Sequence, residues 1–446
     1  MRATAVNIVG AGLAGPLLAI LLARRGFAVS LIERRGDPRG SALEAGRSIN
    51  LALAARGIRA LEHAGVMERV RPLLIAMRGR MLHEVGRPDR LLPYGQREGE
   101  VIFSVGRGAL HRLLIEEAAR FPGVTLRFGE ICEGVSGESA ALDVRDARSG
   151  HRREVPCAPT IAADGAGSAV RASLERRGSI RTREEPLDHD YKELTLPPRQ
   201  ARPALDPHAL HVWPRLGFML IALPNPDGSF TATLFLPREG PGSFAALAHP
   251  GAVEELFARE FPDAAALVPD LLAQFRAHPQ GRLGTIHSAP WHLGSRVLLI
   301  GDAAHAIVPF HGQGMNAAFE DCTALDALLD RHDDWEALFA EFESARRPNT
   351  EAIARMAVEN YEEMRERVLD PKFLRRQRWA LELERRFPDR FIPRYAMVMF
   401  HPEIPYCEAL RRGAVQQEIL DALDARAAGG AEPDHELARR LILERL

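Results

Sequence analysis

The N-terminal part of the chain alternates short apolar segments with a longer segment of helical length. Residues 5–9 and 28–32 are short and mostly apolar, as expected of buried strands, and residues 12–24 between them contain no β-branched run. Strand, helix and strand in this order predict a βαβ unit. Three further segments continue the pattern: a helix over 113–120 and strands over 124–128 and 161–163. We therefore predict an α/β fold here.

The pattern of polar and apolar positions changes near Tyr191. Short segments separated by Pro, Asn, Asp and Gly predict the strands of an antiparallel sheet over 210–213, 218–223 and 230–235. A buried strand over 297–300 then returns to the α/β layer, and the sequence from Ala317 onward is mostly helical in character. A second, β-sheet domain and a helical C-terminal region are thus predicted.

Composition and charge narrow the function classes. With 46% hydrophobic and 26% charged residues, the 446-residue chain has the composition of a folded globular protein. Its 58 basic and 60 acidic residues give a net charge of −2, so no overall field attracts nucleic acid or a membrane surface. Four widely separated cysteines without a CxxC pair indicate neither a disulfide framework nor a zinc site. We expect no metal and a reducing, cytoplasmic location.

The apolar segment 8–23 resembles a signal peptide only at first sight. Glycines at fixed spacing interrupt it, Arg24 and Arg25 follow it, and a new strand begins where a cleavage site would lie. No other apolar run approaches the ~20 residues that cross a bilayer. We therefore expect a soluble protein.

The first candidate motif is Gly10-x-Gly12-x-x-Gly15, between the first strand and the first helix. Glycines there allow a tight turn and bring backbone N–H groups and the positive end of the helix dipole against a diphosphate. Glu33 ends the next strand, where a carboxylate can accept hydrogen bonds from ribose hydroxyls. This order predicts dinucleotide binding, with NAD and FAD both open; the alternative is a tight helix start with an incidental glutamate.

Two later segments bear on the choice between NAD and FAD. One contains Asp164-Gly165, and the other contains Gly301-Asp302-Ala303-Ala304-His305 followed by Gly312-Gln313-Gly314-Met315-Asn316. Together with the glycine-rich start, in this order, they resemble the fingerprints of the flavoprotein aromatic hydroxylases. The resemblance implies a tightly, non-covalently bound FAD, with Asp302 on its ribityl chain and the second glycine-rich turn against its ring.

The resemblance also implies a fold and a set of cofactor-binding residues. The fold is α/β, with a discontinuous Rossmann-like FAD-binding domain (1–72, 101–180 and 286–328), an antiparallel-sheet substrate domain (73–100 and 181–285) and a C-terminal helical region (329–446). For Arg47 and Arg107 the alternative is a surface arginine, and Asp164 is read as structural, with a role towards the pyridine nucleotide as the alternative. The cofactor-binding set is Gly10, Gly12, Leu13, Ala14, Gly15, Glu33, Arg34, Arg47, Ala52, Arg107, Cys132, Asp164, Asp302, Gly314, Met315 and Asn316.

Longer blocks resemble one family within this class, the kynurenine 3-monooxygenases. They include Met77-Arg78-Gly79-Arg80-Met81, Leu92-Pro93-Tyr94-Gly95, Asn360-Tyr361-x-x-Met364-Arg365 and Phe391-Ile392-Pro393-x-Tyr395. The resemblance implies that four residues hold the amino-acid end of L-kynurenine: Arg80, Tyr94, Asn360 and Tyr395. An arginine fork pairs well with a carboxylate. Taken alone, Arg80 could equally be solvated surface, and Asn360 and Tyr395 could cap or pack helices.

The pocket wall is less sharply indicated. Phe218, Phe310 and His311 are candidates to surround the aromatic ring, although plain core is the more frequent role of an aromatic in a strand. Leu216 stands where the family pattern leads us to expect a smaller or more polar residue. Eukaryotic members of the family carry a C-terminal membrane anchor, whereas this chain ends in a charged helix, so we expect no membrane association.

The implied reaction is the hydroxylation of L-kynurenine to 3-hydroxy-L-kynurenine. NADPH would reduce FAD, and the reduced flavin would react with O2 to a C4a-hydroperoxide that delivers its distal oxygen beside the substrate's amine. The sequence contains no second glycine-rich nucleotide fold, so NADPH would dock transiently on the FAD domain. The pathway served and the oligomeric state stay open, with a homodimer among the options.

Three other functions were weighed. A hydroxylase acting on a phenol or benzoate is the nearest, and the amino-acid anchors argue against it. A flavin halogenase is disfavoured because none of Trp213, Trp291, Trp335 and Trp379 forms a W-x-W-x-I segment. A non-catalytic flavin-binding sensor would have no need of the anchor set.

Overall fold

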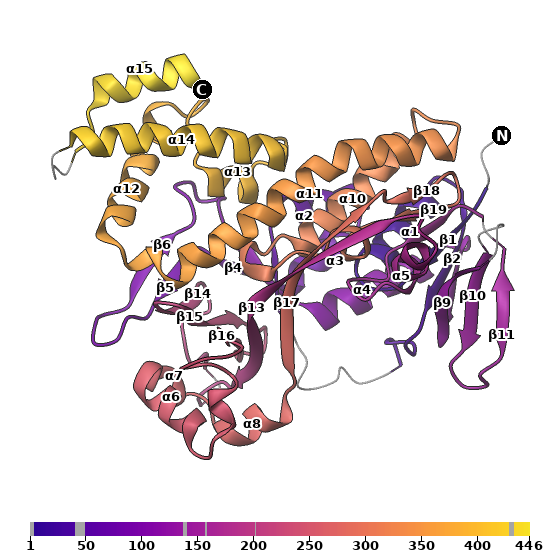
Figure 1. The fold of residues 1–446 in the computed structure, drawn as a ribbon, viewed down its shortest axis with the longest axis horizontal. Coiled ribbons are helices and arrows are strands. Elements are labelled where there is room, and N and C mark those ends of the chain that lie inside the picture. The colour runs from indigo at the N-terminus through magenta and orange to yellow at the C-terminus, as the bar shows by residue number, and fades with distance from the viewer. Residues whose placement is uncertain (1–3, 41–49, 137–140, 157, 201, 428–431) are drawn as a thin grey trace. The chain divides into compact units, whose positions relative to one another are not determined.

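The computed structural model describes residues 4–40, 50–136, 141–156, 158–200, 202–427 and 432–446. Its chain divides into two compact units (Figure 1). The first consists of Met1–Leu74, Val105–Leu187 and Gly284–Ala354, and the second of Ile75–Ser104, Asp188–Leu283 and Arg355–Leu446. Each unit is therefore built from three separate stretches of sequence.

A six-stranded sheet forms the centre of the first unit. Its strand order is β18-β19-β12-β1-β2-β8, and all neighbours are parallel except β18 and β19. The strands are β1 (Ala5–Val9), β2 (Ala28–Glu33), β8 (Val124–Phe128), β12 (Thr160–Ala162), β18 (His292–Leu293) and β19 (Val297–Leu299). The predicted βαβ unit and the return of a late strand to this layer are confirmed.

Buried apolar helices cover this sheet. Helix α1 (Ala14–Arg24) is buried along nearly its whole length and packs against α4 (Arg107–Ala119) and α10 (Gly314–Leu328). Such all-round burial explains why its sequence shows little amphipathic pattern. The unit also contains α2 (Ala55–His63), α3 (Met67–Val70), α5 (Ala169–Arg176), α9 (Asp302–His305) and an antiparallel sheet of β9 (Glu130–Ser136), β10 (Ala141–Asp146) and β11 (Arg152–Val155).

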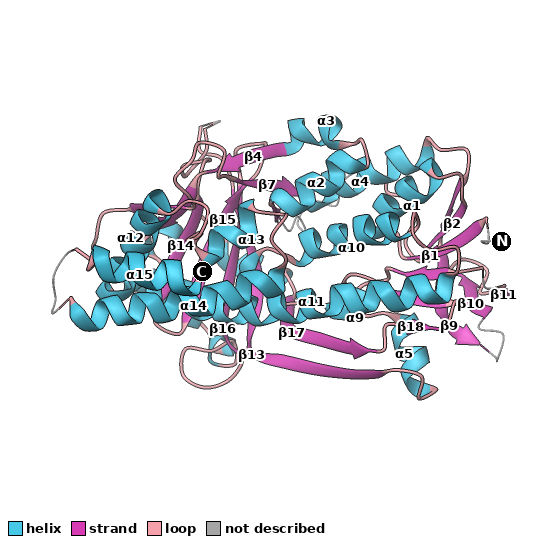
Figure 2. Cartoon of the chain, turned by 90° about the horizontal axis from the view of Figure 1, so that it is seen from above, coloured by secondary structure: helices cyan, strands magenta, loops and turns pink. Residues whose placement is uncertain are grey.

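The second unit is organised on a seven-stranded sheet with the order β17-β13-β16-β15-β14-β5-β6. The long strands β13 (Arg181–Leu196) and β17 (Gln280–Ala289) lie side by side, as Figure 2 shows. The other strands are β5 (Gly79–Leu82), β6 (Arg90–Pro93), β14 (Leu210–Arg215), β15 (Phe218–Pro224) and β16 (Phe230–Pro237). The predicted antiparallel sheet is present, but β14 and β5 pair in parallel.

Aromatic and aliphatic side chains from this sheet form a core with short helices. Trp213, Phe230, Phe257 and Phe261 are fully buried in it. The helices concerned are α6 (Ala252–Glu260), α7 (Pro262–Ala265) and α8 (Leu271–Ala277). Three further strands, β3 (Asn50–Leu53), β7 (Ile102–Gly106) and β4 (Leu74–Met77), form a small sheet of their own.

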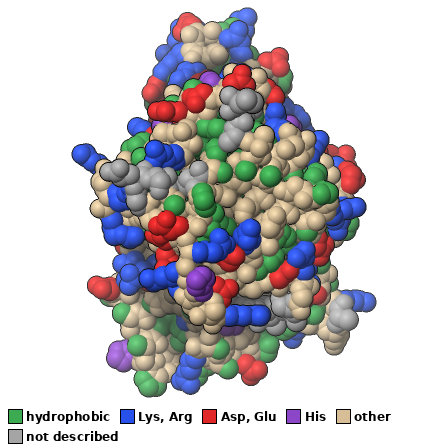
Figure 3. Space-filling view, turned by 90° about the vertical axis from the view of Figure 1, so that its right-hand side faces the viewer, with side chains coloured by type: hydrophobic (Ala, Val, Ile, Leu, Met, Phe, Trp, Pro, Cys, Tyr) green, Lys and Arg blue, Asp and Glu red, His purple; other side chains and the backbone are tan. Residues whose placement is uncertain are grey.

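The C-terminal part of the chain is helical, as predicted. Helix α11 (Trp335–Arg365) is followed by α12 (Pro371–Arg386), α13 (Arg394–Phe400), α14 (Tyr406–Arg426) and α15 (His435–Arg445). Trp379, Leu383, Ile419 and Ile442 are buried in a common core that joins α12, α14 and α15. Among the described residues, no helix has both the length and the apolar character needed to cross a membrane. On the face seen in Figure 3, basic and acidic side chains are interspersed, in keeping with the net charge of −2.

Candidate functional site

The glycine-rich turn between β1 and α1 is shaped for a diphosphate. Gly10 has φ +97°, and a Cβ there would lie 2.5 Å from the carbonyl oxygen of Ala163. A Cβ on Gly15 would lie 2.0 Å from the carbonyl oxygen of Gly10, whereas one on Gly12 would meet nothing within 4 Å. Two glycines therefore permit the tight turn, and the third leaves space beside the helix N-terminus for a ligand to approach the backbone.

Glu33 is placed beside this turn by the end of β2. Its side chain is buried, Oε2 accepts a hydrogen bond from the Ala11 N–H at 2.8 Å, and Oε1 accepts one from the Arg35 N–H at 3.0 Å. A carboxylate has about four acceptor sites, so two remain for ribose hydroxyls. The neighbouring Arg34 is exposed. This geometry fits the adenosine half of a dinucleotide.

Asp302 begins the short helix α9, and a buried carboxylate fixes both ends of that helix. Asp321 Oδ2 accepts hydrogen bonds from the Gly301 N–H at 2.9 Å and from His305 Nε2 at 2.7 Å, and Arg346 Nε donates to Oδ1 at 2.7 Å. Burial alone would raise the pKa of Asp321, but the charges of His305 and Arg346 hold it at about 2. Asp321 is therefore ionised at neutral pH.

The Asp302 side chain is exposed to solvent, although many protein atoms lie around its carboxyl. This partial desolvation raises its pKa, while the charges of His305 and Arg107 lower it. The predicted cofactor residue Arg107, exposed at the start of α4, thus lies close enough to Asp302 to influence it.

The N-terminus of α10 supplies backbone donors. Gly312 precedes it with φ +64°, and a Cβ there would come within 2.9 Å of the Ala52 side chain. Asn316 Nδ2 donates to the carbonyl oxygens of Ala52 (2.9 Å) and Gly312 (2.8 Å), and its Oδ1 accepts from the Ala54 N–H at 3.0 Å. The Asn316 side chain is engaged in this way, whereas the N–H groups at the helix start, from Gly314 onward, have no intrahelical acceptor.

The remaining predicted cofactor residues are more widely spread. Asp164 Oδ2 accepts from the Ala169 N–H at 2.9 Å and so caps α5, while its buried Oδ1 has no partner among the described residues. Cys132 lies on β9 in the small antiparallel sheet. Leu13 and Ala14 stand at the start of α1, and Arg47 falls outside the described residues.

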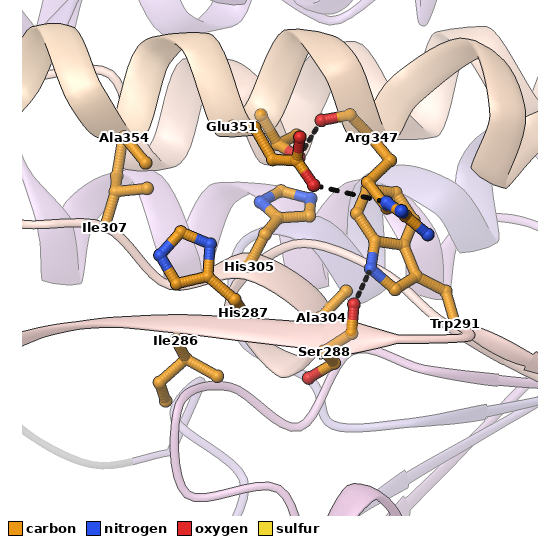
Figure 4. A pocket seen from close by; sticks show the side chains of 11 residues that line it. Ile286, His287, Ser288, Trp291, Ala304, His305, Ile307, Arg347, Glu351 and Ala354 are labelled. Atoms are coloured by element: carbon orange, nitrogen blue, oxygen red, sulfur yellow. Dashed lines mark hydrogen bonds and ion pairs between the residues drawn. The ribbon is translucent and has the colours of Figure 1, made fainter. Parts of the chain in front are cut away.

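A small hollow is lined by side chains from α9, β17 and α11 (Figure 4). His305 packs against the Trp291 ring, with centroids 5.1 Å apart, and His287, Arg347 and Glu351 are among the other lining residues in the figure. Its free space of about 10 Å³ matches the room needed by one water molecule. The hollow therefore cannot hold a cofactor or an aromatic substrate.

The four predicted substrate residues come together in the second unit. Arg80 on β5 donates through Nη2 to Asn360 Oδ1 on α11 at 3.2 Å. Its guanidinium carbon lies 4.8 Å from the centroid of the Tyr395 ring and 5.9 Å from that of Tyr94, and the two rings stack with centroids 5.7 Å apart. Arg80, Tyr94 and Asn360 are buried. The reading of Arg80 as solvated surface is therefore wrong.

Sequence reasoning missed one member of this cluster, Glu363. Its Oε1 accepts a hydrogen bond from Arg80 Nη1 at 3.1 Å. Asn360 and Glu363 are three residues apart on α11, so they share one face of the helix. The three-residue spacing from Asn360 is the feature of the sequence that could have identified Glu363 as a neighbour of the substrate residues.

The protonation states in the cluster follow from burial and charge. Burial alone would lower the pKa of Arg80, but Tyr395, Glu363 and Tyr94 raise it above its usual value, so Arg80 stays charged. Burial raises the pKa of both Tyr94 and Tyr395, so both phenols keep their protons at neutral pH. Arg80 Nε is buried and has no acceptor among the described residues. The cluster thus presents an unsatisfied cationic donor beside phenolic donors.

The candidates for the pocket wall lie in different parts of the chain. Phe218 begins β15 and packs on the Phe261 ring, with centroids 6.0 Å apart, while Phe310 and His311 are buried in the first unit just before α10. Leu216 lies in the turn between β14 and β15 with φ +31° and is 78% exposed. Leu216 is therefore a surface residue of its unit.

The diphosphate turn, Glu33, Asp302 and the N-terminus of α10 are compatible with a FAD-dependent monooxygenase of the flavoprotein aromatic hydroxylase class. The comparisons agree with this class. The family model for the FAD binding domain matches residues 3–225 and 254–357. The structures of 2-methyl-3-hydroxypyridine-5-carboxylic acid oxygenase (TM-score 0.64, 20% identity, 83% of this chain and 94% of that one) and Pseudomonas aeruginosa PqsL (TM-score 0.64, 23% identity, 81% and 96%) share the fold.

Closer relatives define the particular family. Kynurenine 3-monooxygenase of Stenotrophomonas maltophilia is 49% identical over 94% of this chain and 91% of its own length. The enzyme of the same name from Myxococcus xanthus is 45% identical over 100% of this chain and 96% of its own. The chain belongs to the kynurenine 3-monooxygenase family.

Proposed function

We propose that the protein hydroxylates L-kynurenine to 3-hydroxy-L-kynurenine with NADPH and O2, and that Arg80, Tyr94, Asn360 and Tyr395 hold the substrate's amino-acid end. FAD, when bound, supplies the redox chemistry between NADPH and O2. The observation that carries the substrate assignment is the buried Arg80 Nε, a cationic donor that lacks an acceptor in the part of the chain that the structure describes. A buried donor of this kind is costly, and a substrate carboxylate would satisfy it with a charge-assisted bond.

Glu363 favours an amino acid over a simple carboxylic acid. It places a carboxylate within 3.1 Å of the arginine, so the cluster offers both signs of charge over a short distance. The α-carboxylate of kynurenine matches Arg80, and its α-ammonium matches Glu363. A benzoate has only the negative group, so it offers nothing to Glu363, whose cationic partner would remain Arg80 alone.

The role of these residues is orientation. Anchoring the substrate at its amino-acid end fixes where the far end, the aromatic ring, lies, and ordered binding of this kind lowers the entropic part of the barrier. Tyr94 and Tyr395 remain protonated and act as neutral donors to the carboxylate. The substrate's own aniline activates the ring carbon, so no general base is required of the chain.

The cofactor-binding residues and the cellular location belong to the same proposal. We assign FAD to the turn at Gly10–Gly15, to Glu33, and to Asp302 with the α10 N-terminus. The tight glycine contacts, the remaining acceptor sites of Glu33 and the donors at α10 support this assignment. The wide spacing of the four cysteines supports work in a reducing cytoplasm.

Flavin reduction tests the function directly. The purified protein with FAD is mixed with NADPH without oxygen, and bleaching near ~450 nm, where oxidised flavins absorb, is followed with and without L-kynurenine. We expect fast bleaching only with kynurenine and, once oxygen is admitted, a product heavier by one oxygen atom.

Two analogues and one variant refine this test. Kynuramine lacks the α-carboxylate and benzoate lacks the ammonium, so both should stimulate reduction poorly, and R80M should lose the preference for kynurenine over kynuramine. If benzoate stimulates reduction as well as kynurenine does, the amino-acid assignment is wrong.

A further inference from the structure

The loop that carries Tyr94 is folded around one carboxylate. Glu100 Oε2 accepts hydrogen bonds from the Gln96 N–H at 2.7 Å and the Arg97 N–H at 3.0 Å, and Arg97 Nη1 donates to Oε1 at 2.5 Å. Burial would raise the pKa of Glu100, but these donors lower it. A Cβ on Gly95 would come within 2.1 Å of Oε2, so glycine is needed there. The loop is therefore a closed, preorganised turn.

This turn is attached to α12 by a second buried carboxylate. Gln96 Nε2 donates to Glu384 Oε2 at 2.8 Å and to the Leu381 carbonyl oxygen at 2.8 Å, and Arg97 Nη1 lies 3.3 Å from Glu384 Oε1. Glu384 is only 2% exposed. A buried carboxylate is costly unless it is hydrogen-bonded, and the bonds that satisfy Glu384 come from the Tyr94 loop.

The other face of α12 already has its own packing. Trp379 and Leu383 lie in the apolar core shared with α14 and α15. Glu384 contributes no apolar surface to that core and instead points its oxygens at the loop. The charge is therefore placed for the loop and is not required by the helix packing.

We propose that Glu384 is a positioning residue for substrate binding and acts through Gln96 and the loop to hold Tyr94 against Arg80 and Tyr395. The inference rests on the proposed function, because it takes Tyr94 to be a substrate ligand. Under this inference α12 contributes to substrate affinity, although its own residues lie outside the cluster around Arg80.

The test separates KM from kcat. In Q96A and E384A we expect KM for L-kynurenine to rise about tenfold, the scale of one charge-assisted hydrogen bond, with kcat changed by less than about twofold. E384Q retains an acceptor and should restore most of the affinity. Gln96 is exposed, so Q96A should fold even if E384A does not. The matched control is E382A. It removes a carboxylate on the same helix, and this carboxylate pairs with Arg386 and not with the Tyr94 loop.

A double-mutant cycle identifies the path. If Glu384 acts through Tyr94, E384A should add little to the KM of Y94A; a full tenfold increase on that background would overturn the inference. Unchanged KM in both Q96A and E384A would also overturn it.

Hydrogen exchange of the amides of residues 94–100 keeps this inference distinct from the proposed function. If the wild type failed to hydroxylate kynurenine, the proposed function would be wrong. Even then, faster exchange in Q96A and E384A but not in E382A would support the inference that Glu384 holds the Tyr94 loop in place. Unchanged exchange in Q96A and E384A would refute it.

Discussion

Arg80 and Glu363 form an ion pair, and under the proposed function each partner meets one charge of the substrate's amino-acid end. Arg80 is buried and keeps its charge because neighbouring groups raise its pKa, while the side chain of Glu363 is 23% exposed. The more accessible partner is the one that a substrate ammonium can reach without opening the cluster. The two residues should therefore make separable contributions to substrate recognition.

Replacing Glu363 by glutamine tests this separation. E363Q removes the charge but keeps the shape of the side chain, so KM for L-kynurenine should rise about tenfold. KM for a kynurenine analogue that lacks only the α-amino group should stay nearly constant. Steady-state kinetics with both compounds measures the difference. E362Q, which alters an exposed neighbour paired with Arg367, is the control. An equal loss with both compounds would show that Glu363 serves only to hold Arg80.

The sequence could identify most of this cluster but not its geometry. Arg80, Tyr94, Asn360 and Tyr395 were suggested by resemblance, and the fold brings them together from β5, the loop after β6, α11 and α13. Glu363 was missed because a glutamate on a polar helix is usually solvated, and only its distance to Arg80 distinguishes it. The contact of Glu384 with the Tyr94 loop could not be predicted either, since burial of a charge depends on contacts that sequence spacing does not reveal.

At the level of elements, α9 depends on α10 for its position. Asp321 on α10 bonds the Gly301 N–H and His305, which lie at the two ends of α9, and Arg346 from α11 neutralises it. Gly301 has φ +56°, a conformation that side chains other than glycine rarely adopt. The backbone that presents Asp302 is thus set by a buried charge network.

Loss of the Asp321 charge should therefore weaken cofactor binding. In D321N one oxygen becomes an amide donor facing either His305 or Arg346, so we expect the dissociation constant for FAD to rise about tenfold or more. Recovery of flavin fluorescence on dilution of the holoprotein measures it. D330N, on an exposed carboxylate near the end of α10, is the control and should bind FAD normally. Unchanged FAD binding in D321N would show that α9 holds its position without this charge.

The same scale shows which elements a sequence pattern can predict. The first βαβ unit was found because its strands are apolar on both faces and its glycines mark the turn. The first half of β13 was not found because Arg181–Glu185 is mostly exposed and lacks an apolar face. The parallel pairing of β14 with β5 joins segments far apart in the sequence, and a local pattern carries no information about such pairing.

For the molecule as a whole, buried histidines set how stability changes with pH. His211 is 1% exposed; its Nε2 lies 2.9 Å from the Asp206 carbonyl oxygen and its Nδ1 lies 2.8 Å from His83 Nε2. The Asp206 carbonyl oxygen can only accept, so Nε2 carries a proton and donates to it, and Nδ1 faces His83. A second proton would place a positive charge on a ring that is removed from water. Burial accordingly lowers the pKa of His211 from 6.5 to about 4.

This lowered pKa predicts a loss of stability in mild acid. Below pH 6.5 the unfolded chain takes up a proton at His211, while the folded chain does not until about pH 4. The free energy of unfolding should therefore fall by up to ~1.4 kcal/mol per pH unit across this window, for a total of about 3 kcal/mol, and is regained as the pH rises. Urea unfolding of the wild type between pH 4.5 and 7.5 measures the slope. H211Q should be less stable at pH 7.5, but its free energy of unfolding should change less with pH. H151Q, at an exposed position, should keep the wild-type slope. A wild-type slope in H211Q would assign the acid sensitivity to other groups, of which His83, whose pKa is also lowered by burial, is the next to examine.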